Sequence, residues 1–239
     1  MSAARRVRLL VEGCLDAAIA TWLLRRAGLA AVPEQVGGGW TGVVRSLIRA
    51  SLEGLGAPLG LVDADESADK RLEEIKALAK SCCPRLSVGA ETVVEPSRGP
   101  PLLRLEVKEP SGRSGAGFLT LWCRDPWRGC NGGTVEDLLW AMMEEAWGCR
   151  PGGACAVCDG ERCPRKGWEM RLQKMLPLAV LVGCAGGSIV DASSLERRCC
   201  GVDVLGVLED PEKGARLAAT RAAGAYLRLL GEYLVELLA

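Results

Sequence analysis

Three acidic residues stand where they could bind a metal ion. Glu12 ends the apolar segment 6–12 (RVRLLVE), and Asp63 and Asp65 directly follow the apolar segment 58–62 (PLGLV). Each segment predicts a buried strand, and the ligands of an open parallel sheet lie at the carboxyl ends of its strands. If the two strands are neighbours, the three carboxylates meet at one edge, and Asp63 and Asp65 point the same way because they are two residues apart.

Such a cluster has a defined chemistry. Clustered carboxylates repel one another unless a cation neutralises them, and oxygen ligands that leave room for water suit Mg²⁺ or Mn²⁺. A metal ion held in this way can orient a phosphate and activate water for phosphodiester cleavage. The three residues are therefore candidates for a catalytic metal centre.

The elements that must position these residues follow an alternating pattern. Strand-like and helix-like segments alternate three times, with short connections between them. The predicted strands are 6–12, 31–36 and 58–62, and the predicted helices are 16–27, 41–55 and 68–80. This alternation is typical of an α/β fold with a mainly parallel sheet flanked by helices.

The pattern changes after these elements. Residues 84–117 contain two alternating segments, 88–94 and 102–107, between clusters of Pro, Gly and Ser. They predict an antiparallel hairpin or an inserted flap. A buried strand is predicted at 118–123 and a helix at 134–147, with Thr134 as its N-cap.

We divide the chain into an α/β domain, residues 1–147, and a C-terminal region, residues 148–239. The C-terminal region begins with a loop rich in Cys and Gly and ends in a predicted helix, 212–238, with Leu and Tyr at helical spacing. This stripe is expected to pack against the sheet or against a predicted helix at about 170–181. A homodimer interface is the less favoured alternative.

Several short motifs together resemble the Toprim domain, which topoisomerases, bacterial-type primases, recombination proteins and OLD-family nucleases share. The resemblance covers residues 5–147 and is closest to the DUF3226 family of Toprim-like proteins. The motifs that carry it are V-E-G-x-x-D at 11–16, the glycine turn 37–39, G-L-V-D-A-D-E at 60–66 followed by Arg71, and Trp122 followed by G-T-V-E-D at 133–137.

The resemblance implies roles for the acidic residues. Glu12 would be a general acid/base or a metal-linked carboxylate, and Asp63 and Asp65 would be Mg²⁺ ligands. Three further acids could support a second metal ion, or could equally be charges at helix N-termini: Asp16, Glu66 and Glu136.

The resemblance also implies a function, which is Mg²⁺-dependent phosphotransfer on DNA or RNA, first of all phosphodiester hydrolysis by a nuclease. A topoisomerase needs a tyrosine nucleophile on another domain, whereas Tyr226 and Tyr233 both fall on the predicted last helix. The alternative is a non-catalytic module that binds nucleic acid or nucleotides in DNA repair, recombination or RNA processing. The lack of a basic stripe favours this alternative.

Two features could bind phosphate. Gly37, Gly38 and Gly39 precede a predicted helix whose N-terminus could accept a phosphate, although a plain tight turn is an equal interpretation. Arg71 could contact phosphate, as could Arg5, Arg6 and Arg45, although any one of them could be an ordinary surface charge.

The composition excludes several classes of site. The chain contains no histidine, so a Ser-His-Asp triad, a Cys-His pair and an imidazole-ligated zinc site are excluded. It has 30 basic and 30 acidic residues, so net charge does not indicate a nucleic-acid partner. We find no signal peptide and no apolar segment long enough for a bilayer, and expect a cytoplasmic protein without a membrane partner. Its excess of Arg over Lys is compatible with a thermophile.

The twelve cysteines include one group with ligand-like spacing. Four of them form C-x5-C-x2-C-x4-C and could bind Zn²⁺, form disulfides or remain free thiols: Cys149, Cys155, Cys158 and Cys163. An iron–sulfur cluster is less favoured. The adjacent pairs Cys82-Cys83 and Cys199-Cys200 are expected to send their members to separate partners rather than to bond internally.

Overall fold

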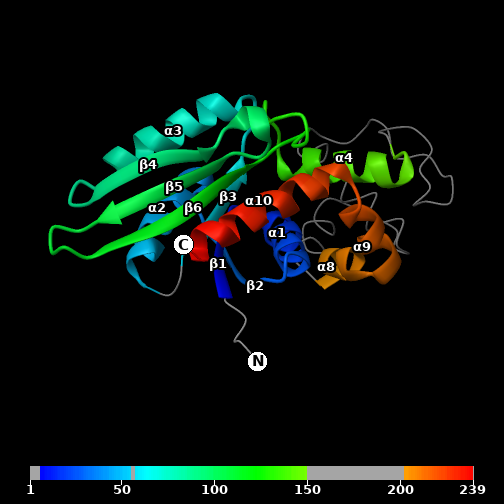
Figure 1. Cartoon of the computed structure of the whole chain (residues 1–239), viewed down its shortest axis with the longest axis horizontal. Helices are drawn as coiled ribbons and strands as arrows, with labels where there is room; N and C mark the ends of the chain where they lie inside the picture. The colour runs from blue at the N-terminus through cyan, green and yellow to red at the C-terminus, as the bar shows by residue number, and fades with distance from the viewer. Residues whose placement is uncertain (1–5, 55–56, 150–201, 239) are drawn as a thin grey trace.

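The computed structural model describes residues 6–54, 57–149 and 202–238, and a six-stranded sheet runs through its centre (Figure 1). The sheet has the order β2-β1-β3-β6-β5-β4, in which the pairs β2–β1, β1–β3 and β3–β6 are parallel. The predicted α/β class with a mostly parallel sheet is confirmed. The first and third strands are neighbours, which brings their carboxyl ends to one edge.

The elements lie close to their predicted positions. The first half comprises β1 (Arg6–Val11), α1 (Cys14–Arg26), β2 (Ala30–Gln35), α2 (Gly39–Leu52), β3 (Leu59–Asp63) and α3 (Ala68–Ser81). The second half comprises β4 (Ser87–Val94), a 3-10 turn η1 (Pro96–Arg98), β5 (Leu102–Lys108), β6 (Ser114–Trp122), α4 (Val135–Trp147), α8 (Val202–Glu209), α9 (Pro211–Ala218) and α10 (Arg221–Leu238).

Alternation along the strands explains the layers. In β3, Leu59 and Leu61 belong to a core cluster shared with α1, α4 and α10, whereas Val62 belongs to a second cluster shared with α2 and α3. Successive side chains of a strand point to opposite faces, so β3 contributes to both clusters. The sheet is therefore covered by helices on both faces.

The segment 84–117 is part of the sheet. β4 pairs antiparallel with β5, and β5 pairs antiparallel with β6, so the hairpin alternative is the one present and there is no separate flap. The strand predicted at 118–123 begins four residues earlier, at Ser114, because its first residues pair with β5.

The predicted single helix 212–238 is wrong, because α9 and α10 are separate helices. α9 ends at Ala218, and the Thr220 side chain accepts a hydrogen bond from the Ala223 N–H at 3.2 Å, which caps the start of α10. Thr side chains form hydrogen bonds to nearby backbone groups and therefore favour helix ends. The high Leu and Ala content of the segment does not reveal such an end.

The Tyr stripe of α10 packs on the sheet, as expected. The Tyr226 hydroxyl donates to the Leu121 carbonyl and accepts from the Cys123 N–H, both at 2.8 Å. Tyr233 packs edge-on against Phe118, with ring centroids 4.8 Å apart. Each buried large side chain contributes about 1.5–3 kcal/mol. The helix therefore stabilises β6 and the residue that follows it.

The cysteines differ from expectation. Cys123 and Cys130 form a disulfide, a pairing that the sequence did not predict. Cys82 and Cys83 are free thiols with sulfur atoms 3.3 Å apart, so within the described ranges neither bonds to a separate cysteine. Cys149 is buried and disulfide-bonded. Several predicted features lie outside the described residues: the helix at 170–181, the pair Cys199-Cys200, and Cys155, Cys158 and Cys163.

Across the described ranges, none of the helices combines the length and the apolar character that a membrane span requires.

Candidate active site

Glu12 and Asp63 meet at the edge where β1 and β3 end. Glu12 directly follows β1, and its Oε1 atom accepts a hydrogen bond from the backbone N–H of Asp63 at 3.3 Å. Asp63 is the last residue of β3, and its Oδ1 atom accepts from the backbone N–H of Val135, the first residue of α4, at 3.0 Å. The positive end of the α4 dipole therefore points at the Asp63 carboxylate.

Asp16 also belongs to this cluster. It lies in the first turn of α1, is 7% exposed, and its Oδ1 atom accepts from the indole Nε1–H of Trp122 at 2.6 Å. Burial, together with the charges of Glu12 and Glu136, raises the pKa of Asp16 to about 7 against the opposing hydrogen bond from Trp122. Asp16 is thus a buried acid that can hold a proton near neutral pH.

The pKa values of Asp63 and Glu12 are raised for the same reasons as that of Asp16. Burial, together with the neighbouring charges of Asp16, Glu136 and Glu12, raises the pKa of Asp63 to about 8 against the opposing hydrogen bond from the Val135 N–H. Burial also raises the pKa of Glu12, against the Asp63 N–H and the positive charge of Arg71. The structure therefore brings four acidic residues, from the end of β1 and from α1, β3 and α4, into one electrostatic cluster, which we call the carboxylate cluster: Glu12, Asp16, Asp63 and Glu136.

Asp65 is oriented differently from the expectation. Its φ of 51° is left-handed, so the backbone leaves the extended conformation that would align it with Asp63. Its backbone N–H and carbonyl bond to Gly133, at 3.0 and 2.6 Å, and its carboxylate forms an ion pair with Arg71. The charge of Asp65 still raises the pKa of Glu12, so it lies within electrostatic reach of the carboxylate cluster.

Glu66 is exposed in the turn before α3. It lines a cavity of about 280 Å³ together with Ser67, Lys70 and Glu74. None of the pKa shifts of the carboxylate cluster has Glu66 among its causes. Glu136, in contrast, acts on both Asp16 and Asp63.

The glycine turn faces Glu12. Gly38 and Gly39 have φ values of 91° and 62°, which glycine adopts without strain, and a Cβ on Gly39 would lie 3.5 Å from Glu12 Oε2. The backbone N–H of Trp40 stabilises the charged form of Glu12 and so opposes the rise of its pKa. The N-terminus of α2, which the sequence offered either as a phosphate site or as a plain tight turn, therefore already has a carboxylate beside it.

Arg71 is held by protein groups. It is 9% exposed; its Nε–H donates to the Asp63 carbonyl at 3.2 Å, and its guanidinium lies 4.7 Å from the centroid of the Trp40 ring. Its other nitrogens bond to Asp65 and, at 2.9 Å, to Glu74. In this arrangement Arg71 fixes the end of β3, and a phosphate contact would have to compete with these partners.

The donor chemistry fits a hard divalent cation. Four carboxylates, three of them with raised pKa values, are oxygen donors whose mutual repulsion a cation would relieve. Within the described part of the chain, however, no three acidic or cysteine side chains are already arranged as a ligand set. Binding would therefore need side-chain rotation or bridging waters, which Mg²⁺ commonly retains.

Three residues have contacts at the site that the sequence did not predict: Trp122, Val135 and Tyr226. Trp122 was noted only as a mark of resemblance, whereas its indole N–H fixes the Asp16 carboxylate. The Val135 N–H and the Tyr226 hydroxyl also act at the site, through Asp63 and through the backbone that follows Trp122. The sequence shows a Trp at a strand end and a capped helix start, but it does not show which residues they contact.

Comparisons of the chain with models of known protein families, with curated proteins and with solved structures found no significant match.

Proposed function

We propose that the protein is a Toprim-like enzyme that uses Mg²⁺ or Mn²⁺ to hydrolyse phosphodiester bonds of DNA or RNA. The observation that carries the proposal is the carboxylate cluster at the ends of β1 and β3, in which burial and like charge raise three pKa values. Perturbed acids gathered at the ligand edge of an α/β sheet are typical of functional sites. The order of the Toprim-like motifs along the chain supports the same proposal.

The cluster divides into residues with different tasks. Glu12 and Asp63 would hold the metal ion, and Asp65 could join them by leaving Arg71. Bound metal would supply stabilisation of the phosphoryl charge and a more acidic water. Glu12, half-buried and with a raised pKa, is suited to accept or donate a proton at the reacting phosphate. Asp16, held by Trp122, would keep the local charge negative when it ionises.

The test is an incubation with single- and double-stranded DNA and RNA in the presence of Mg²⁺ or Mn²⁺. The wild type should cleave at least one substrate, and Glu12→Gln and the double variant Asp63→Ala, Asp65→Ala should each lose at least about a hundredfold in rate. Asp69→Asn is the matched control, because its side chain is exposed in α3. Cleavage by the wild type no faster than by the double variant would refute the nuclease proposal.

A second function, a non-catalytic nucleic-acid binding module, is favoured by one specific observation. Asp65, one of the expected metal ligands, is engaged in an ion pair with Arg71. Calorimetry with Mn²⁺ separates the two functions. Mn²⁺ binding that Asp63→Asn abolishes supports the enzyme, whereas nucleic-acid binding without any Mn²⁺ binding supports the module.

A further inference from the structure

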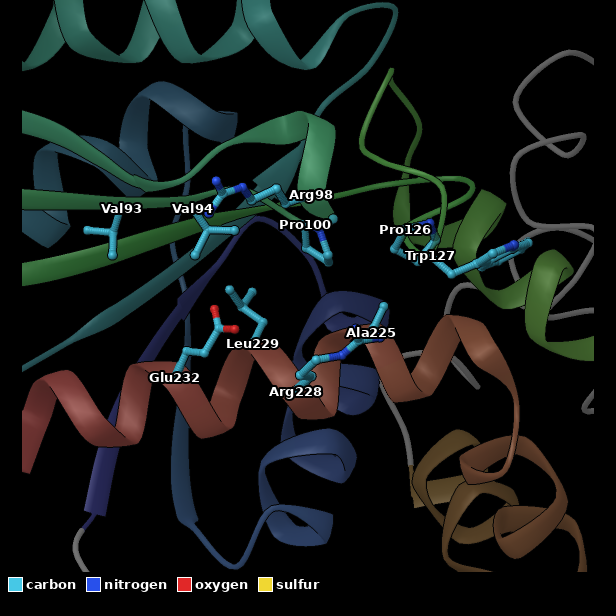
Figure 2. Close-up of a pocket in the computed structure, with 11 residues that line it drawn as sticks. Val93, Val94, Arg98, Pro100, Pro126, Trp127, Ala225, Arg228, Leu229 and Glu232 are labelled. Carbon is cyan, nitrogen blue, oxygen red and sulfur yellow. The ribbon is translucent and has the colours of Figure 1, made fainter.

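A second site lies between α10 and the loops at the end of the sheet (Figure 2). It is a cavity of about 450 Å³, within the size range of small-ligand pockets. Figure 2 shows Leu229 and Glu232 rising from α10 toward Val94 and Arg98 on the opposite wall. Pro126 and Trp127, from the loop after β6, also line it.

The cavity carries positive charge that the described protein groups leave unpaired. Arg98 and Arg228 line it, and neither side chain has an ion pair or hydrogen bond to any described residue. Other arginines are engaged: Arg8 pairs with Glu34, and Arg71 with Glu74. Glu232 is the one acid among the described lining residues, so these residues have a net charge of +1 from two arginines and one glutamate. An anion is the complementary ligand.

The wall that carries Arg98 is fixed by covalent and backbone contacts. The Cys123–Cys130 disulfide closes the loop after β6, and the Cys130 N–H donates to the Pro96 carbonyl at 2.6 Å. Gly129, with a φ of 108°, approaches so closely that a Cβ would lie 3.0 Å from the same carbonyl. The turn η1 and the disulfide loop therefore form one unit that holds Arg98 opposite α10.

The rest of the lining is apolar. Leu229, Val94, Pro100 and Pro126 offer hydrocarbon surface between the two arginines. Such a surface favours a ligand with a flat, weakly polar body attached to its anionic group. A free inorganic anion would leave this surface without a partner.

The cavity lies at the same edge of the sheet as the carboxylate cluster. β5 is antiparallel to β6 with Leu102 opposite Thr120, so Pro100, just before β5, lies beside the carboxyl end of β6. The loop that contributes Pro126 and Trp127 continues to Gly133 and Val135, whose backbone groups bond to Asp65 and Asp63. One loop therefore connects the cavity to the carboxylate cluster.

We propose that this cavity binds one unpaired nucleotide of a single-stranded nucleic acid. Arg98 and Arg228 contact a phosphate, the base or sugar lies against Leu229 and Pro126, and Glu232 accepts a hydrogen bond from an amino or hydroxyl group. A base inside a duplex cannot present its face to such a cavity. This inference rests on the proposed function, from which it takes nucleic acid as the substrate class. It adds that the nucleic acid is single-stranded.

The test measures binding of a fluorescein-labelled single-stranded hexanucleotide by anisotropy, in EDTA so that no cleavage occurs. The double variant Arg98→Ala, Arg228→Ala should bind roughly ten- to a hundredfold more weakly. The slope of log K against log salt should fall by roughly 0.7 for each phosphate that the variant no longer neutralises. Arg49→Ala, Arg113→Ala is the matched control, since both side chains are exposed and lie outside the cavity lining.

The outcomes separate this inference from the proposed function. Binding that depends on Arg98 and Arg228 and survives Asp63→Asn supports the cavity, even if the wild type cleaves no substrate. Equal binding by the cavity variant and the control variant would overturn the inference, even if the protein proves to be a nuclease. A duplex, or an acidic peptide of equal charge, that binds the wild type as tightly as the single strand would also overturn it. Melting temperatures of all variants confirm that they remain folded.

Discussion

The substitution Asp63→Asn tests the electrostatics of the carboxylate cluster directly. Asn keeps the shape of the side chain and can still accept the hydrogen bond from the Val135 N–H, but it cannot ionise. The pKa of Asp63 is raised from 3.8 to about 8 in the folded protein. Between about pH 5 and pH 7, folded Asp63 therefore holds a proton that the unfolded chain has released.

The sign and size of the effect follow from this difference in bound protons. Because the folded state binds one proton more than the unfolded state, the free energy of unfolding falls as pH rises, by about 1.4 kcal/mol per pH unit for each such group. The contribution of the raised Asp63 pKa to the free energy of unfolding is fully present below about pH 4 and is lost as pH rises toward 8. Asp16, with a pKa of about 7, contributes in the same direction.

We therefore expect wild type and Asp63→Asn to differ in slope. In urea unfolding in EDTA at several pH values from 5 to 7, the free energy of unfolding of the wild type should fall about 1.4 kcal/mol per pH unit more steeply than that of Asp63→Asn. Asp69→Asn, an exposed control, should keep the slope of the wild type. Parallel lines for wild type and Asp63→Asn would refute the conclusion that burial and like charge keep Asp63 protonated.

Four further outcomes are expected. In thermal melts, Mn²⁺ should raise the melting temperature of the wild type at pH 8 but not that of Glu12→Gln, Asp63→Asn, because a cation relieves repulsion only where these carboxylates can ionise; an equal rise in both proteins would contradict this. Tyr226→Phe should cost about 1–3 kcal/mol in urea unfolding, because the Leu121 carbonyl and the Cys123 N–H lose a buried partner, and an unchanged stability would contradict it. Cys123→Ser, Cys130→Ser should lower stability by roughly 2.5 kcal/mol from loop entropy, whereas Cys82→Ser, Cys83→Ser, which replaces two free thiols, is the matched control; equal stability of the two variants would contradict this. A chain ending at Asp210 lacks α9 and α10, and should melt at a lower temperature; if it kept the melting temperature of the wild type, the packing of the Tyr stripe would not matter for stability.

The sequence by itself predicted the sheet and the position of the acids along it. Apolar runs of strand length alternate with helical stretches, and this local periodicity is enough to place β1, β3 and α3 within a few residues. Glu12 and Asp63 follow from the same pattern, since each stands where an apolar strand ends and the chain must turn. Thr134 as the N-cap of α4 is also a local signal, and its side chain accepts from the Asp137 N–H.

Tertiary structure alone decided which acids meet and how each is held. The Trp122–Asp16 hydrogen bond joins residues 106 positions apart, and the Tyr226–Cys123 bond spans 103. Residue type does not reveal such partners, because they depend on the order of strands in the sheet. Asp65 is an example. Strand alternation predicts that its side chain points the same way as that of Asp63, but its pairing with Gly133 and Arg71 requires a left-handed backbone that changes the direction of the side chain. The Cys123–Cys130 disulfide and the cavity beside it also depend on contacts between η1, the loop after β6 and α10, which no single segment encodes.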